Sequence, residues 1–393
     1  RREAGMRQFI RILLQTIKNA VFSHDSFMIF AIASLFYMVF YGLPYDNQII
    51  VKVPTAIVNL DQSRASAEFA EKIKSAPAVK AVIETADFAK AEAAFRRSEA
   101  DVIVTIPENF SRDIERGDQT GVTVFSNGAL PVKGRAVSAA VLAIVTEENA
   151  THAAERLVAQ GLNPILVKQM SLAPAPFSSQ DLFNNISGYG YYTVPMVAIV
   201  IIQAVMLFGV GIALGGWLSA ENPPEFFKEA FASPKHFLAL FTGFWVIALF
   251  WSFFIEGLGL YALTMPTLLN PLSTVAAVIA FTLALCSLAT LLTLAMNSNR
   301  YAAGLVLASA PSVFLSGLVF PMENFAAWVL PFAWMIPTTP GCQAIVLASQ
   351  EGATIAQILP QISANLAQAI IYGTLAYLML KKRIAERQEK AAR

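Results

Sequence analysis

Cysteine, histidine and charge are all scarce in this sequence. The chain has 2 cysteines and 3 histidines among 393 residues, too few for a disulfide framework or a cluster of metal ligands. Charged residues make up 14% of it, against roughly 25% in an ordinary soluble domain. Lys and Arg number 28 against 27 Asp and Glu, so the basic excess that nucleic-acid phosphates require is missing. These shortages exclude a disulfide-stapled secreted scaffold and disfavour a metalloprotein or a nucleic-acid-binding protein.

Apolar residues are abundant instead. They make up 56% of the sequence, and the mean hydropathy is +0.55. A soluble globule cannot bury that much apolar surface, so lipid must cover part of it. Residues 45–187 hold 14 basic and 17 acidic side chains, which is typical of a water-soluble domain. Residues 188–380 hold nine charged side chains: Glu221, Glu225, Lys228, Glu229, Lys235, Glu256, Arg300, Glu323 and Glu351.

A membrane-spanning helix needs about 20 mostly apolar residues. The first candidate, Asp25–Leu43, has a long apolar core and no Ala-x-Ala-like site before Pro44, which favours a retained span over a cleaved signal peptide. Five more candidates follow the soluble domain: Tyr192–Leu218, Phe237–Leu260, Leu272–Met296, Tyr301–Val319 and Asn365–Leu380. The sequence therefore predicts a polytopic α-helical membrane protein with six transmembrane helices and an inserted extracytoplasmic α/β domain.

The orientation follows from the basic residues near the spans. Six spans put both termini on one side, and the positive-inside rule places that side in the cytoplasm. Connections 261–271 and 320–364 contain no Lys or Arg and are predicted to lie outside. The predicted divisions are 1–23 (amphipathic interface helix), 24–43 (first span), 44–187 (extracytoplasmic α/β domain), 188–380 (membrane domain) and 381–393 (basic cytoplasmic tail).

Residues 6–21 predict an amphipathic helix lying flat at the cytoplasmic interface. Its apolar stripe comprises Met6, Phe9, Ile10, Leu13, Leu14, Ile17 and Val21, with Arg7, Arg11 and Lys18 off the stripe. In the α/β domain, strands are expected at Val53–Asn59, Val79–Thr85, Asp101–Ile106 and Gly121–Phe125, and helices at Ala65–Lys74, Phe88–Arg97, Phe110–Arg116 and Lys133–Gly161.

Two connections carry candidate functional residues. Cytoplasmic loop 219–236 holds a short predicted helix with an apolar stripe, and two readings stay open: a plug for a groove on a cytoplasmic subunit, or rings packed against the protein's own spans. The apolar stripe of loop 219–236 consists of Phe226, Phe227, Ala230 and Phe231.

Outer segment 317–364 is apolar and interrupted by proline, which predicts short helices dipping partway into the membrane.

Other chemistry is weakly supported. The chain has no Gly-x-x-x-x-Gly-Lys-Ser/Thr phosphate loop, so ATP-driven transport would need another polypeptide. His152 is the only histidine of residues 44–187, and a Ser–His–Asp hydrolase would have to use it. Glu256 is the one carboxylate inside a predicted span. Intramembrane acids are functional hypotheses by default, although Gly257 and Gly259 next to it also fit a partly wet, interfacial glutamate.

Four segments resemble the ABC-2 type exporter permeases, in the bacterial subgroup with a large extracytoplasmic insert after the first span. Val-Asn-Leu-Asp-Gln-Ser at 58–63 is similar to the family's valine-rich strand, Asp and small residue. Residues 102–111, Val-Ile-Val-Thr-Ile-Pro-Glu-Asn-Phe-Ser, resemble its apolar strand followed by Ile-Pro and Phe-Ser. The approach to the second span (Phe183, Asn184, Gly188, Tyr189, Pro195) and the outer hairpin (Ser316, Gly317, Phe320, Pro321, Pro331, Pro337, Gly341) complete the likeness.

The resemblance covers nearly the whole chain and implies specific roles. It implies a permease without its own ATPase or cofactor, paired with a second permease subunit (identical or a sister chain) and with cytoplasmic ATPases that hold ATP and Mg. The family's Glu-x-Glu-Arg-Gly-Thr coupling loop is matched here only by Glu221 and by Ser233-Pro234. The roles expected on this basis are ATPase coupling (Glu221, Phe226, Phe227, Phe231), an outer gate (Gly317, Phe320, Pro321) and a pathway (Gln203, Met206, Ser309, Ser312, Ser316).

The function expected is therefore export of a hydrophobic or amphipathic substrate across a bacterial inner membrane, with a periplasmic adaptor as a possible further partner. A rival class is a non-transporting membrane receptor or scaffold whose outer α/β domain binds a ligand or a partner protein. The hydrolase using His152 is the third alternative. Association with an ATPase separates the first class from the other two.

Overall fold

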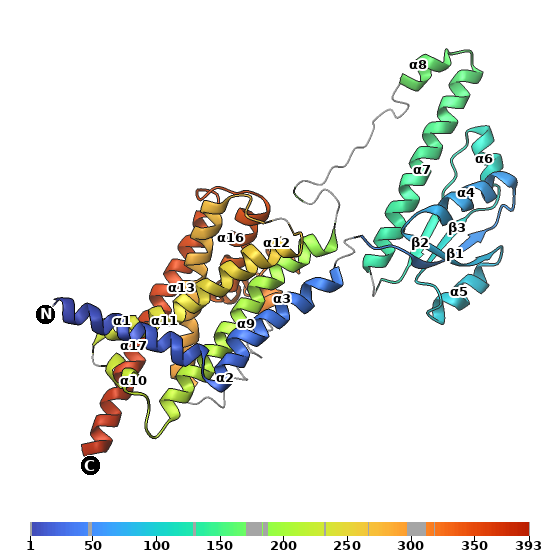
Figure 1. Cartoon of the computed structure of the whole chain (residues 1–393). Helices are drawn as coiled ribbons and strands as arrows, with labels where there is room; N and C mark the ends of the chain where they lie inside the picture. The colour runs from blue at the N-terminus through green and yellow to red at the C-terminus, as the bar shows by residue number, and fades with distance from the viewer. Residues whose placement is uncertain are drawn as a thin grey trace. The chain divides into compact units, whose positions relative to one another are not determined.

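A computed structural model describes residues 2–45, 49–128, 131–169, 183, 188–231, 233–265, 267–296, 312–317 and 319–392. The chain divides into two compact units (Figure 1). One unit joins Arg1–Gln48 to Asp181–Arg393, and the other is Ile49–Gln180. Each unit has its own buried apolar core. Outside the described residues lie Ser309, Arg300, Asn184 and most of the predicted span Tyr301–Val319.

The unit Ile49–Gln180 is built on a sheet with strand order β2-β1-β3-β4. β1 runs parallel to both β2 and β3, and β4 is antiparallel to β3. The predicted alternation of strands and helices is confirmed, with boundaries shifted by one or two residues. The elements are β1 (Val53–Asn59), α4 (Arg64–Ser75), β2 (Val79–Thr85), α5 (Phe88–Arg96), β3 (Val102–Ile106), α6 (Phe110–Arg116), β4 (Thr123–Ser126), α7 (Pro131–Ala159) and α8 (Pro164–Gln169).

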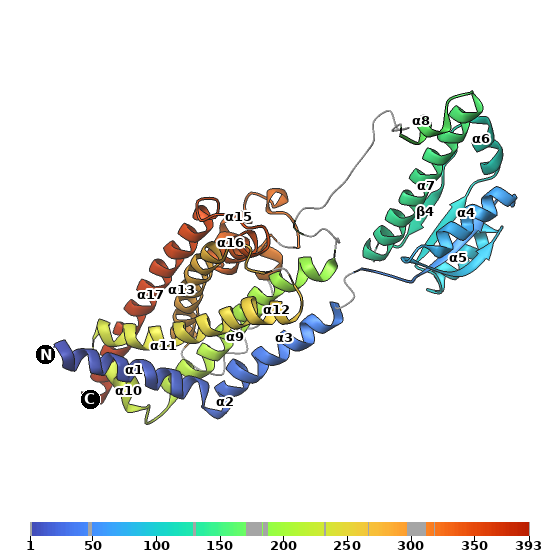
Figure 2. The same cartoon turned by 45° about the horizontal axis from the view of Figure 1, so that its top comes forward.

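Different helices cover the two faces of this sheet (Figure 2). Ile57 of β1 packs with Phe69 of α4 and Val137 of α7 in one core. Val58 packs on the opposite face with Ala91 of α5. Successive strand side chains point to opposite faces, and both faces are covered, so the central strands read as continuous apolar runs. The sheet is therefore a three-layer arrangement of helix, sheet and helix.

The other unit is helical. Its N-terminal part contains α1 (Arg2–Val21), α2 (His24–Phe27), the π-helix η1 (Met28–Ala33), α3 (Ser34–Gly42) and η2 (Leu43–Tyr45). Its C-terminal part contains α9 (Tyr189–Ser219), α10 (Glu225–Ala230), α11 (Pro234–Phe253), the π-helix η3 (Phe254–Gly259), α12 (Leu260–Ala262), α13 (Pro271–Met296), η5 (Met322–Asn324), α15 (Leu330–Met335), α16 (Thr338–Gln350) and α17 (Leu359–Ala392).

Four of these helical segments are long and apolar enough to cross a membrane, namely Tyr189–Ser219, Pro234–Ala262, Pro271–Met296 and Leu359–Arg383. They correspond to the second, third, fourth and sixth predicted spans. The first predicted span forms a shorter apolar helix, Met28–Gly42. The last apolar helical segment, Leu359–Arg383, extends beyond the predicted span Asn365–Leu380 at both ends. The described residues thus support four spans by length and composition.

Helix α13 lies at the centre of the helical unit, where it packs against α9, α11, α16 and α17. Small residues allow the close approach. A Cβ atom added at Gly341 of α16 would overlap the ring of Phe281 in α13, which is fully buried. Polar groups on α13 are paired inside the unit. Trp245 of α11 donates from Nε1 to Thr282 Oγ1 at 3.0 Å.

The predicted amphipathic helix is α1, and it lies against α11. Phe9, Ile17 and Val21 of the predicted stripe pack against the core. Ile12 and Thr16, which the predicted stripe did not include, are fully buried. A Cβ atom at Gly243 of α11 would come within 2.7 Å of the Thr16 side chain, so glycine is needed at this crossing. Met6 and Leu14 remain 55% and 58% exposed. The apolar stripe is therefore divided between α11 and an outer surface that lipid can cover.

The close contact at Gly341 gives a test of the fold. We expect Gly341→Ala to lower the free energy of unfolding by about 1–3 kcal/mol, because the methyl group displaces the buried Phe281 ring. The gain in helix propensity, about 1 kcal/mol, offsets part of this loss. Thermal unfolding can be followed with a maleimide dye, since Cys286 and Cys342 are buried and become reactive only on unfolding. The matched control is Gly216→Ala in α9, where nothing lies within 4 Å of the added atom. Equal midpoints for the two variants would contradict the packing described.

Candidate functional site

Two of the predicted pathway residues are brought together inside the helical unit. Gln203 of α9 donates from Nε2 to Ser312 Oγ at 2.7 Å. Gln203 is 2% exposed and Ser312 is fully buried. Met206, one turn further along α9, belongs to the same apolar core. The pair therefore joins α9 to the segment 312–317 at a depth that water does not reach in this state.

The remaining pathway residues behave differently. Ser316 is buried but donates to Val313 O at 2.7 Å, within its own helical turn. Ser309 lies outside the described residues. Hydroxyl groups in membrane helices commonly satisfy themselves on the preceding turn or on a neighbouring helix. A pathway role for these side chains stays a prediction, and the contact that the structure adds is the one between Gln203 and Ser312.

Two of the three residues predicted as an outer gate, Gly317 and Pro321, line a hollow in the helical unit. The hollow has a volume of about 640 Å³. Gly317 adopts φ +83°, and a Cβ atom there would come within 2.7 Å of Met322, so the turn requires glycine. Pro321 and Met322 form one wall. The other lining residues are Tyr192, Val319, Glu323, Leu330, Trp334, Gln343, Val346 and Leu347.

Phe320 lies beside this hollow rather than in its wall. Its side chain is 52% exposed. The ring stacks on Phe325, with centroids 6.2 Å apart and planes 6° apart. Residues of α15 and α16 close the hollow from the C-terminal side, as the proline-broken pattern predicted. A gate role for Gly317, Phe320 and Pro321 stays a prediction, and Tyr192 of α9 lines the same hollow as Gly317 and Pro321.

The aromatic residues of loop 219–236 face inward. Phe226 is 4% exposed and Phe227 is fully buried. Trp217 of α9 lies 5.2 Å from Phe226 and 5.6 Å from Phe227, measured between ring centroids. Phe231 is half-buried and meets Phe227 edge-on at 4.4 Å. Of the two readings that the sequence left open, the burial of these rings supports packing against the protein's own helices. Trp217, near the C-terminal end of α9, supplies the aromatic surface that they contact.

The polar side of the same loop contacts the N-terminal helix. Glu229 of α10 forms an ion pair with Arg11 of α1 and accepts a hydrogen bond from Gln8 Nε2 at 3.3 Å. The hydrogen bond from Arg11 lowers the pKa of the Glu229 carboxyl below its usual range. Glu221, predicted for ATPase coupling, is exposed at the end of α9. Together these residues form a polar surface across α1 and α10.

Glu256 is buried, not wet. It lies in the π-helix η3 and is 2% exposed. Within the described residues, neither carboxyl oxygen has a hydrogen-bond partner. Its backbone carbonyl accepts from Thr267 Oγ1 at 2.7 Å. The partly wet reading of this residue does not fit its burial. The helix does not end at Gly257 but continues through η3 to Ala262.

In the α/β unit, the two motifs that carry the family resemblance meet. Ser111 donates from Oγ to Asp61 Oδ2 at 2.9 Å, and the backbone of Leu60 bonds to Ile106 O at 3.1 Å. Burial opposes ionisation of Asp61, but hydrogen bonds from Ser63 and Ser111 outweigh it and lower the pKa of this carboxyl. The parallel strands β1 and β3 end side by side, so residues that follow them come together. The motifs therefore fix how α4 and α6 leave the sheet.

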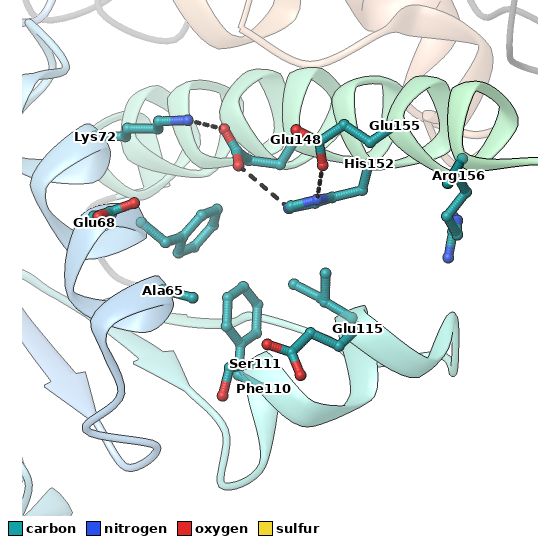
Figure 3. Close-up of a pocket in the computed structure, with 13 residues that line it drawn as sticks. Ala65, Glu68, Lys72, Phe110, Ser111, Glu115, Glu148, His152, Glu155 and Arg156 are labelled. Atoms are coloured by element: carbon teal, nitrogen blue, oxygen red, sulfur yellow. Dashed lines mark hydrogen bonds and ion pairs between the residues drawn. The ribbon is translucent and has the colours of Figure 1, made fainter.

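A cleft of about 400 Å³ lies between α4, α6 and α7 of the same unit (Figure 3). His152 on α7 lies 3.1 Å from Glu155 through Nδ1 and 3.7 Å from Glu148 through Nε2. Ser111 also lines the cleft but bonds to Asp61. Across the described ranges, no serine hydroxyl bonds to His152, so the geometry shows no assembled Ser–His–Asp triad.

Comparison with known families decides the class. The family model described as ABC-2 family transporter protein matches residues 26–378. The chain belongs to the ABC-2 family of transporter proteins. The match spans both units, so the α/β unit is part of the family's architecture and not an unrelated fusion. No curated protein matches the sequence. As a membrane component of an ABC-2 transporter, the protein belongs to a class that pairs in general with an ABC ATPase.

The pair Gln203–Ser312 gives a testable consequence. We expect Ser312→Ala to cost about 1–3 kcal/mol of stability, because it leaves a buried amide without its acceptor. In a Gln203→Leu background, the same Ser312→Ala change is expected to cost much less. The free energies come from unfolding midpoints in this double-mutant cycle, read with the maleimide dye. Equal costs in both backgrounds would show that the hydrogen bond does not couple α9 to segment 312–317.

Proposed function

We propose that this ABC-2 family protein is the permease subunit of an ATP-driven exporter in a bacterial inner membrane. It moves a hydrophobic or amphipathic substrate outward, and a separate subunit holds ATP and Mg and hydrolyses the nucleotide. The single observation that carries the proposal is the family match over residues 26–378. The sequence has no phosphate-loop motif, which supports hydrolysis by a separate subunit in this proposal.

The proposed topology has six spans with both termini in the cytoplasm. Four long apolar helices and the shorter Met28–Gly42 account for five spans, and Tyr301–Val319 supplies the sixth from its apolar sequence. The basic residues of the N-terminal helix and of the tail 381–393 favour the cytoplasmic side. Ion-paired surface side chains on the α/β unit suit water. The single span proposed before this unit favours the side opposite the cytoplasmic N-terminus.

Coupling to the ATPase is proposed to act through α1 and α10 together. Arg11 and Glu229 join the two helices, and Phe226 and Phe227 anchor α10 on Trp217 of α9. A force on the exposed side of α10 would therefore reach α9 through packed rings and α11 through α1. The aromatic residues act in this proposal as an internal anchor, and the polar residues of the loop, including Glu221, form the contact surface.

The outer hairpin is proposed as the exit gate. Gly317, Phe320 and Pro321 precede α15 and α16, and the hollow behind them is shared with Tyr192 of α9. Because α9 also carries Trp217 at its other end, one helix connects the proposed coupling surface with the proposed gate. A second permease subunit, identical or a sister chain, completes the transporter, and a periplasmic adaptor is a further proposed partner.

The ion pair between α1 and α10 tests the coupling. We expect Arg11→Glu to reduce cargo-stimulated ATP hydrolysis by roughly 1.4-fold to fivefold in vesicles holding the permease and its ATPase. The size follows from about 0.2–1 kcal/mol for an exposed ion pair. The double variant Arg11→Glu/Glu229→Arg restores the opposite charges and should recover the rate. A double variant as slow as the single one would contradict coupling through this contact.

Co-purification with an ATPase distinguishes the proposed exporter from the non-transporting receptor or scaffold. A tagged chain that retains no phosphate-loop ATPase during purification, although the ATPase is co-expressed, would sink the exporter proposal. That outcome would favour the receptor or scaffold.

Orientation is tested by cysteine labelling. We expect Lys90→Cys, on α5, to react with a membrane-impermeant maleimide in intact spheroplasts. Lys228→Cys, on α10, should react only after the membrane is opened. Cys286 and Cys342 are buried and give little background. The reverse pattern would overturn the proposed topology.

A further inference from the structure

We propose that the cleft between α4, α6 and α7 binds a small cationic amphiphile, such as a hydrophobic amine or a quaternary cation. Its volume of about 400 Å³ lies within the range of small-molecule sites, roughly 300–1,000 Å³. Three helices of one compact unit enclose it, so its shape does not depend on how the two units are arranged (Figure 3).

The floor of the cleft is apolar and rigid. Phe69 of α4 and Phe110 of α6 pack with ring centroids 5.0 Å apart and are 4% and 5% exposed. Ile114 lies one turn beyond Phe110 on α6 and also lines the cleft. These side chains belong to the main core of the unit, which fixes their positions. The floor therefore offers a fixed apolar contact to the body of a ligand.

The walls carry an excess of negative charge. Four carboxylates line the cleft, against the two cations Lys72 and Arg156. Lys72 is committed to an ion pair with Glu148, and Arg64 outside the cleft pairs with Glu68 at 2.9 Å. Two lining carboxylates, Glu115 of α6 and Glu155 of α7, therefore have no Lys or Arg partner among the described residues. The four carboxylates are Glu68, Glu115, Glu148 and Glu155.

Glu115 and Glu155 are the two that a ligand cation would meet. They come from opposite walls, α6 and α7. Glu115 has no ion pair within the described residues, and Glu155 has only the imidazole of His152. Arg156 also lines the cleft, but it lies at the end of α6, where its Nη1 would be 2.8 Å from a Cβ atom added at Gly117. Apolar floor and opposed carboxylates together favour an apolar cation and disfavour an anion of the same shape.

Binding can be measured on the full chain in discs of phosphatidylcholine, with empty discs subtracted. Tetraphenylphosphonium and tetraphenylborate are matched probes, because they share a shape and differ in the sign of charge. We expect saturable binding of tetraphenylphosphonium at one site per chain and none of tetraphenylborate above the empty discs. Equal binding of the two ions, or no saturable binding of the cation, would overturn the inference.

The variant Glu115→Gln/Glu155→Gln keeps both side-chain shapes and removes two charges. We expect its Kd for tetraphenylphosphonium to rise about tenfold, equivalent to about 1.4 kcal/mol. The matched control Glu92→Gln/Glu99→Gln removes the same charge outside the cleft and should leave the Kd unchanged. Unfolding midpoints of both variants confirm that the fold is retained. Equal weakening by both pairs would show that only the net charge of the unit matters, which also refutes the site.

The inference names a ligand class for the proposed exporter, but its test uses neither ATP nor transport. A chain that binds the cation here and exports nothing would refute the exporter proposal alone. A chain that exports and does not bind here would refute only the cleft.

Discussion

The helical unit depends on one constraint: lipid offers no hydrogen bonds, so each polar group inside it must find a partner within the protein. Thr290 and Thr293 of α13 donate to carbonyl groups one turn back, at 2.8 and 2.7 Å. Trp245 bonds to Thr282 in a neighbouring helix, and Gln203 bonds to Ser312. These contacts leave the outer surface apolar and turn the polar side chains into links between helices. Several buried atoms depart from this pattern in the described part of the chain. They include both carboxyl oxygens of Glu256, the hydroxyl groups of Ser252 and Thr338, and Gln203 Oε1.

The same constraint explains the division of the chain into two units. Charged side chains cannot be satisfied in the lipid-facing helices, so they gather at α1 and α10 and in the unit Ile49–Gln180. In that unit the strands are buried on both faces by helices, and ion pairs lie on the outer surface, as in a water-soluble protein. Membership of the ABC-2 family covers both parts, which makes the α/β unit a component of the transporter.

Local patterns in the sequence predicted the α/β unit well, because strand alternation and helix periodicity are properties of short segments. The strand Val53–Asn59 and the helix Phe110–Arg116 match the structure at both ends. The direction faced by Phe226 and Phe227 could not be read in this way, because one apolar stripe fits an internal surface as well as a partner's groove. Burial of Glu256 was missed for a related reason. Its neighbour Gly257 indicated a helix end, whereas the chain passes through a π-helix and continues to Ala262.

That π-helix has a mechanical consequence. A π-turn holds one residue more than an α-turn, so converting η3 into regular α-helix would rotate the following residues by about 100° around the axis. The segment Leu260–Ala262 would rotate about the helix axis relative to α11. Glu256 lies within η3, so the same conversion would also change the direction in which its carboxyl group points. Any change of winding in η3 would therefore move Glu256 and the segment Leu260–Ala262 together.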